Sequence, residues 1–191
     1  YRIKTLKSKH TFLLPDELEK LESLELTGKS VTYRHSLEAF LFCCYTGLRY
    51  SDFTQLSEKN IIFIENRPWI IFTTIKTGAE VRLPLALLFG GKGWKLLRKH
   101  QKHLNEFFNL KANSTVNKDL IRIGKLAGIQ KHFSFHSARH TNATLLIYKG
   151  VNITTVQKLL GHRNVSTTQI YSEVMATTIV NDLKKCSKGN R

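Results

Sequence analysis

Four separate segments of the sequence carry side chains that could act together on one phosphate group. These side chains are Arg49, Lys76, His136, Arg139, His162 and Tyr171. In-line attack at phosphorus places extra negative charge on the equatorial oxygens, which two guanidinium groups and an imidazole can neutralise. A phenol has a pKa of about 10, so nearby cations are needed to make it a nucleophile. A lysine or histidine can protonate the departing oxygen, and the set therefore suits cleavage of a phosphodiester.

The first two segments each have a simpler interpretation when taken alone. Arg49 follows the helix-ending Gly47, and Asp52 lies three residues further on, where it could hold the guanidinium rigid for a phosphate. That spacing by itself is more typical of a surface ion pair. Lys76 lies in a turn between two expected strands and would project away from the sheet, toward a DNA groove or a leaving oxygen. A solvated turn lysine is the commoner occurrence.

The other two segments contain the histidines, the second arginine and the tyrosine. His136 and Arg139 are three residues apart, so on a helix they share one face and could bind the same phosphate. The alternative is a helix start with incidental basic residues. His162 follows Gly161, a second helix-ending glycine, and Tyr171 comes nine residues later, where alone it would be read as a half-buried tyrosine.

The pattern favours neither a metal site nor another cofactor. No cluster of carboxylates is suited to Mg²⁺, which argues against a two-metal nuclease. The three cysteines, Cys43, Cys44 and Cys186, form no CxxC or Cys/His motif with metal-ligand spacing. We expect reduced thiols that pack as small apolar groups.

Charge and composition point to a polyanionic partner. The 191 residues include 30 Lys+Arg and 14 Asp+Glu, a formal net charge of +16, and 41% are hydrophobic. This composition predicts a folded domain, and double-stranded DNA is the simplest partner for such an excess of positive charge. No apolar run approaches the roughly 20 residues of a membrane span, and no signal peptide is evident, so we expect a cytoplasmic protein with no membrane role.

The elements that must position these side chains are mainly helices. Apolar residues recur at helical spacing from Pro15 and again over 37–44, and a short third helix is expected over 49–56. Residues 60–64, 69–75 and 80–85 are β-branched and aromatic runs, which predict a small three-stranded antiparallel sheet. Helices are expected again after residue 92, over 136–149, from Asn152 to Gly161, near Tyr171 and over 174–185.

The order of these motifs resembles the catalytic domain of the tyrosine recombinases, the phage integrase family, and especially mobile-element integrases of Bacteroides-type bacteria. The matching motifs are Thr-Gly-Leu-Arg, the hairpin Lys-Thr-Gly, His-x-x-Arg-His-Thr, Leu-Leu-Gly-His and Thr-Thr-Gln-Ile-Tyr. The resemblance implies the fold of that catalytic domain. It implies that Arg49 and Arg139 clamp the phosphate and that His136 and His162 contact its oxygens. Lys76 would be the general acid and Tyr171 the nucleophile, with Asp52 and His140 as buttressing residues.

The resemblance also implies an activity and a domain organisation. We expect a site-specific recombinase that cleaves and rejoins DNA through a 3′-phosphotyrosine, for integration or excision of a mobile element, and that assembles on DNA as a tetramer in its full-length form. Residues 1–10 would be a linker from a missing N-terminal DNA-binding domain, 11–185 the catalytic domain and 186–191 a basic tail. The apolar residues of 174–183 could dock on a neighbouring protomer or in cis. A type IB topoisomerase and a catalytically silent DNA-binding regulator are the alternatives.

Overall fold

The structure, a computed structural model, describes residues 11–164 and 166–169. Its helices are α1 (Pro15–Glu22), α2 (Arg34–Thr46), α3 (Tyr50–Phe53), α4 (Lys92–Lys99), α5 (Leu104–Phe108), α6 (Asn113–Leu126), α7 (Phe135–Tyr148), α8 (Ile153–Leu160) and α9 (Ser166–Gln169). Its strands are β1 (Ile61–Ile64), β2 (Arg67–Thr73) and β3 (Glu80–Pro84), and short 3-10 turns cover Gly28–Tyr33, Glu58–Asn60 and Leu88–Gly91. The expected class, mainly α with a three-stranded antiparallel sheet, is confirmed.

Several expectations fall on other parts of the chain. The proposed linker (1–10), the nucleophile Tyr171, the last helix (174–185) and the tail with Cys186 lie outside the described residues. Within the described residues, Cys43 and Cys44 are free and fully buried, as expected of small apolar groups. Burial raises the pKa of both thiols well above the ordinary value, so neither is a reactive thiolate.

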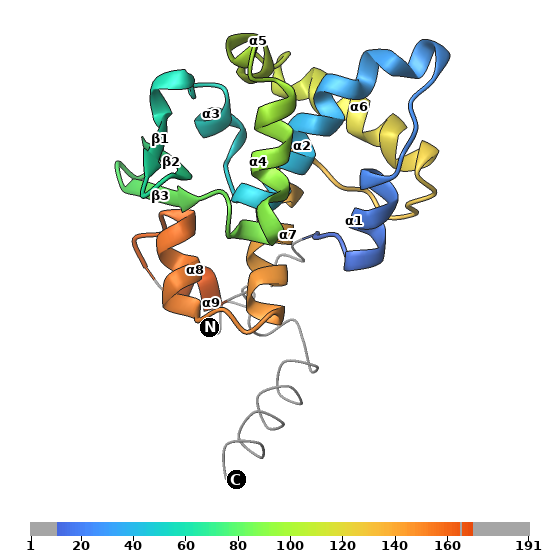
Figure 1. The fold of residues 1–191 in the computed structure, drawn as a ribbon. Helices are drawn as coiled ribbons and strands as arrows, with labels where there is room; N and C mark the ends of the chain where they lie inside the picture. The colour runs from blue at the N-terminus through green and yellow to red at the C-terminus, as the bar shows by residue number, and fades with distance from the viewer. Residues whose placement is uncertain (1–10, 165, 170–191) are drawn as a thin grey trace, which may run out of the picture.

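Helix α2 forms the centre of the molecule, with α7 and α4 packed against it (Figure 1). All its residues from Ser36 to Thr46 are buried, because helices surround it. Phe40 contacts the rings of Phe133 and Phe135, which lie just before and at the start of α7. A single apolar core therefore fixes where the C-terminal end of α2 meets the middle of α7.

The sheet lies on one side of this core, with α8 below it in the view of Figure 1. Strands β1 and β2 are joined by Glu65 and Asn66, both with positive φ, which is the geometry of a tight hairpin turn. Strand β2 starts at Arg67, two residues earlier than expected, and ends at Thr73. It ends there because Thr74 N–H donates to the carbonyl of Ala79 at 2.9 Å and closes the second turn.

Helix ends follow the expected signals closely, while some boundaries shift. Gly47 and Gly161 have φ of +74° and +62° and end α2 and α8 in the left-handed conformation, and Asn152 caps α8 through its side chain. The expected helix over 49–56 is shorter: α3 covers Tyr50–Phe53, with Thr54 as its C-cap. Within the described residues, no helix has both the length and the apolar character needed to cross a bilayer.

Candidate functional site

Arg139 lies in the second turn of α7 and joins the ends of two other helices. Its side chain is buried, at 3% exposure, and it donates from Nη1 to the carbonyl of Gly47 at 2.8 Å and from Nη2 to the carbonyl of Leu160 at 2.6 Å. Carbonyls at helix C-termini have no partner within the helix and carry the negative end of the dipole. Arg139 therefore holds the ends of α2 and α8 together and is itself held rigidly.

Arg49 lies two residues beyond Gly47, at the N-cap position of α3. Its Nη1 lies 3.4 Å from Oδ2 of Asp52, whose side chain is 1% exposed, so the expected pair exists. Gly47 sets the approach of the chain, since a Cβ there would lie 2.6 Å from Cδ2 of Leu160 and 2.8 Å from Oδ1 of Asn142. The close packing of α2 on α7 and α8 therefore places Arg49 beside the helix ends that Arg139 binds.

Asp52 also connects Arg49 to the turn that carries Lys76. Its Oδ1 accepts a hydrogen bond from the backbone N–H of Ile75 at 3.0 Å, while Oδ2 faces Arg49. Lys76 itself is exposed, as the turn predicts. The expected buttressing position of Asp52 thus has a geometric basis, because one buried carboxylate orients both the arginine and the lysine turn.

His162 follows α8 and lies within the field of both arginines. Burial, together with the charges of Arg139 and Arg49, lowers the pKa of this imidazole from 6.5 to about 4, so it is neutral at pH 7. Its Nδ1 is 2.8 Å from the hydroxyl of Thr168 in α9. Nδ1 is therefore occupied, and Nε2 is the ring nitrogen that could meet a phosphate.

His136 and His140 occupy one side of the first turns of α7. The His136 side chain is exposed and that of His140 buried, and their rings meet edge to face with centroids 4.6 Å apart. The spacing that places His136 and Arg139 one turn apart on a helix is confirmed, since α7 begins at Phe135. His140 contacts His136 directly and is therefore placed to orient it.

No metal centre emerges from the described residues. In 11–164 and 166–169, no group of three or more His, Cys, Asp or Glu side chains could hold a metal ion. Several such side chains, among them His35, His100, His103 and Glu38, line a hollow of about 310 Å³. There Glu38 already binds Lys99 and His100, so its carboxylate is neutralised by the protein itself.

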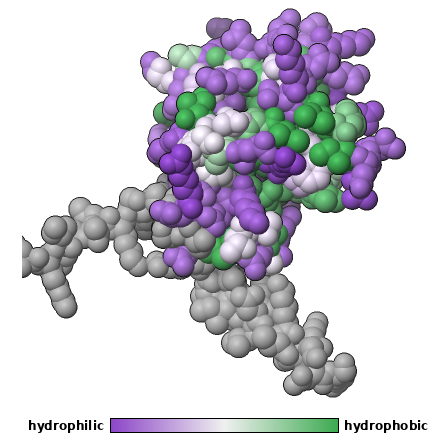
Figure 2. All heavy atoms as spheres, turned by 90° about the vertical axis from the view of Figure 1, so that its left-hand side faces the viewer, coloured by the Kyte–Doolittle hydropathy of each residue, from purple (hydrophilic) through white to green (hydrophobic). Residues whose placement is uncertain are grey.

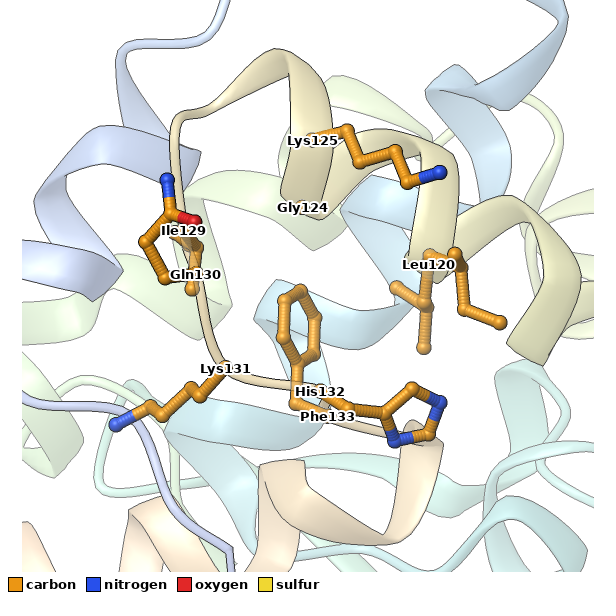
Figure 3. Close-up of a pocket in the computed structure, with 9 residues that line it drawn as sticks. Leu120, Gly124, Lys125, Ile129, Gln130, Lys131, His132 and Phe133 are labelled. Atoms are coloured by element: carbon orange, nitrogen blue, oxygen red, sulfur yellow. The ribbon is translucent and has the colours of Figure 1, made fainter.

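A second hollow, of about 180 Å³, lies between the end of α6 and the loop that leads to α7 (Figure 3). The ring of Phe133 stands in its middle, and Lys131, which pairs with Glu17 at 2.5 Å, points away from it. Of the candidate catalytic residues that the structure describes, none lines this hollow. The described candidates Arg49, Arg139 and His162 instead lie at the helix ends around Arg139.

Three residues near the candidate groups were missed by sequence reasoning: Thr77, Arg163 and Thr168. Thr77 and Arg163 contact each other, and Thr168 binds His162. Thr77 and Arg163 are the immediate neighbours of Lys76 and His162, and that adjacency was the one signal available. It carries little weight without the tertiary contacts.

Two arginines, Arg49 and Arg139, and the imidazole of His162 thus converge at helix ends, on a mainly helical domain with a small sheet. The model of the Phage integrase family matches residues 11–177. The chain therefore belongs to that family, as the motif order suggested.

Relatives in this family are tyrosine recombinases. The chain is 34% identical over 169 residues to a tyrosine recombinase of Pseudothermotoga lettingae, with 86% of this chain and 56% of the relative covered. It is 35% identical over 143 residues to tyrosine recombinase XerA of Saccharolobus solfataricus, with 73% of this chain and 46% of the relative covered. The chain thus spans about half the length of these relatives.

Solved structures confirm the expected fold. The crystal structure of XerA recombinase is similar with a TM-score of 0.69 at 22% identity, covering 92% of this chain and 64% of that one. The structure of the Tn1549 transposon integrase in complex with circular intermediate DNA is similar with a TM-score of 0.67 at 18% identity, covering 95% of this chain and 67% of that one. The described residues therefore have the fold of a tyrosine recombinase catalytic domain.

Proposed function

We propose that this chain carries the catalytic domain, residues 11–185, of a site-specific DNA recombinase that cleaves and rejoins DNA through a covalent 3′-phosphotyrosine. The observation that carries the proposal is the convergence of Arg49, Arg139 and His162 at the ends of α2 and α8. Two preorganised guanidinium groups and a neutral imidazole that donates a hydrogen bond can stabilise the charge that develops on the non-bridging oxygens of a phosphodiester under attack. Family membership supports the same reaction.

The proposed roles are those that the family motifs imply for these groups. Arg49 and Arg139 would clamp the scissile phosphate, with His162 donating from Nε2 and His136 assisting proton transfer at the tyrosine. Tyr171 would attack phosphorus, and Lys76 would give its proton to the departing 5′ oxygen. The phosphotyrosine keeps the energy of the bond, so rejoining needs neither ATP nor a bound metal.

Double-stranded DNA is the proposed partner, with a tetramer as the working assembly. The net charge of +16 favours a polyanion, and on the sheet side of the molecule hydrophilic residues surround smaller apolar patches (Figure 2). A lambda integrase tetramer bound to a Holliday junction shares the fold, with a TM-score of 0.64. We further propose a cytoplasmic, nucleoid-associated protein that integrates or excises a mobile element, with 1–10 as a linker and 186–191 as a basic tail. The Bacteroides-type origin stays a prediction.

Two other functions are less well supported. A type IB topoisomerase would relax supercoils without forming junction products, and the recombinase relatives do not favour it. A DNA-binding regulator without catalysis would give no covalent adduct. The set of six groups argues against that alternative, because a regulator has no need of a general acid or a nucleophile.

A covalent-trapping assay tests the proposal. The substrate is a duplex nicked a few nucleotides to the 3′ side of the cleavage site, so that the short fragment bearing the released 5′ hydroxyl diffuses away and the adduct accumulates. Wild-type protein should form an adduct that survives denaturing electrophoresis, and Tyr171→Phe should form none while its DNA affinity stays nearly unchanged. An adduct that persists in Tyr171→Phe would overturn the assignment of the nucleophile.

A further inference from the structure

The turn between β2 and β3 is tied to the rest of the molecule on both sides of Lys76. Among the residues that the structure describes, the Lys76 ammonium makes no hydrogen bond, so its position depends on the backbone that carries it. On the N-terminal side, Ile75 N–H donates to Asp52 at 3.0 Å. On the C-terminal side, the contacts are made by Thr77. The lysine therefore sits between two anchored neighbours.

Thr77 is anchored to the segment that carries His162. Its hydroxyl donates to the carbonyl of Gly161 at 3.1 Å. Its carbonyl accepts two hydrogen bonds from the guanidinium of Arg163, from Nε at 2.9 Å and from Nη2 at 2.5 Å. Two donors of a planar guanidinium on one oxygen fix direction as well as distance.

The surrounding packing leaves the hairpin little freedom to move away from α8. A Cβ on Gly161 would lie 2.7 Å from Cγ2 of Val81 and 3.0 Å from Cγ2 of Thr74, so the end of α8 lies against the hairpin itself. The turn is also closed internally, with Gly78 N–H donating to the carbonyl of Thr74 at 2.9 Å. The tip of the turn, Lys76 and Thr77, is thus the part of the hairpin whose position depends on the hydrogen bonds from Arg163.

We propose that Arg163 is a positioning residue, which holds the Thr77 carbonyl and thereby keeps Lys76 aligned with the leaving 5′ oxygen. This inference rests on the proposed recombinase function. Because Arg163 directly follows His162, one segment positions both the imidazole at the phosphate and the lysine at the leaving group. A side chain remote from the phosphate would then control proton transfer.

The affected step is the loss of the 5′ oxygen. The Tyr171 oxygen forms a bond to phosphorus, the bond from phosphorus to the 5′ oxygen breaks, and its electron pair stays on that oxygen. Lys76 gives this oxygen a proton, so a 5′ hydroxyl leaves and the amine is left neutral. Displacing the acid from hydrogen-bonding reach loses most of its contribution, since misplacement by about 1 Å can slow a reaction about 10²-fold.

A sulfur substitution isolates this step. In a 5′-bridging phosphorothiolate, the leaving group is a thiolate, which needs no proton near neutral pH because thiols have a pKa of about 8.5. Single-turnover cleavage is measured on two otherwise identical nicked duplexes that carry the site cleaved by wild type, one with oxygen and one with sulfur at the scissile position. Protein is kept at saturating concentration, so that DNA affinity does not enter the rate.

Arg163→Ala should slow cleavage of the oxygen substrate about 10- to 100-fold and leave the sulfur substrate within about twofold of wild type. Lys76→Ala should show the same selectivity with a larger loss, and Arg163→Lys an intermediate one. Arg82→Ala is the matched control: this exposed arginine of β3 pairs with Glu80, and its loss should slow neither substrate.

Equal loss on both substrates in Arg163→Ala would overturn the inference, because it would place Arg163 at the phosphate or in folding. No loss on either substrate would overturn it as well. If wild type forms an adduct with neither duplex, the proposed function itself fails, and that result is distinct from a wild-type enzyme whose variant lacks selectivity.

Discussion

The buried arginine site and the exposed lysine turn hold their cations in opposite ways. Arg139 is 3% exposed, and its own guanidinium bonds to two helix ends fix it. Lys76 is exposed, and the contacts in the described part of the chain fix the backbone around it, through Ile75 and Thr77. A group that must bind a phosphate in one orientation benefits from a rigid setting, whereas a general acid must follow a leaving atom as it departs.

The difference also determines what each region transmits to its neighbours. At the arginine site, a change in one residue alters the packing of α2, α7 and α8 together. At the turn, a change alters a few hydrogen bonds. Substitutions in the first region should therefore affect both stability and catalysis, and those in the second should affect mainly one step.

Loss of the Arg139 guanidinium should have the largest effect. We expect Arg139→Ala to slow single-turnover DNA cleavage by a factor on the order of 10²–10³, the usual consequence of losing one donor to a developing oxyanion. The exposed Arg98 on α4 provides a control of equal charge, and Arg98→Ala should cleave at nearly the wild-type rate. A loss of tenfold or less in Arg139→Ala would mean that other groups hold the phosphate.

Gly47→Ala should be the most damaging glycine substitution at the buried site. The new methyl group would lie 2.6 Å from Leu160 and 2.8 Å from Asn142, in a residue with φ of +74°. Left-handed strain and overpacking together predict a loss of about 3 kcal/mol in the free energy of unfolding, measured by denaturant titration. A variant as stable as wild type would show that the α2 end has room to shift.

Gly78→Ala provides the matched change in the lysine turn. Its φ is +64°, but a Cβ there would meet only Arg163 Nη2, at 3.9 Å. Strain alone predicts a loss of about 1 kcal/mol in the same titration. Gly28→Ala, with φ of +53° and nothing within 4 Å, should lose a similar amount. Equal losses at positions 47 and 78 would remove the contrast between the two regions.

The pKa of His162 is sensitive to the charges of the two arginines and can be measured without any DNA cleavage. Burial first, then the charges of Arg139 and Arg49, lower this pKa to about 4, so Arg49→Gln should raise it by a fraction of a unit. An NMR titration of the half-buried His162 imidazole measures this pKa shift. Arg98→Ala should not change the pKa of His162. A pKa near 6.5 in wild type would contradict both the burial of His162 and the proximity of the two arginines.

The lowered pKa of His162 also predicts how the free energy of unfolding changes with pH. Between about pH 6.5 and 4, the unfolded chain binds a proton at His162 that the folded chain does not. The contribution of neutral His162 to the free energy of unfolding is therefore full above pH 6.5 and is lost as the pH falls toward 4. His162→Gln should show a smaller loss of stability over this window than wild type does.

Local signals predicted much of the fold. Gly47, Gly161 and Asn152 mark helix ends because their preferences for left-handed backbone or capping act over a few residues. The sheet was visible in its β-branched runs, although Thr74 and Ile75 belong to the turn and not to β2, because hydrogen bonds across the turn override strand propensity.

Residue types and motif order alone determined the family, the candidate set of six groups and the general fold class. Only the tertiary structure decided that Arg139 is buried between helix ends, that the pKa of His162 is lowered to about 4 and that Arg163 contacts the lysine turn. These features join residues far apart in the chain, 92 positions between Arg139 and Gly47 and 86 between Arg163 and Thr77. Burial and electrostatic fields depend on such long-range packing, which no local pattern of residues records.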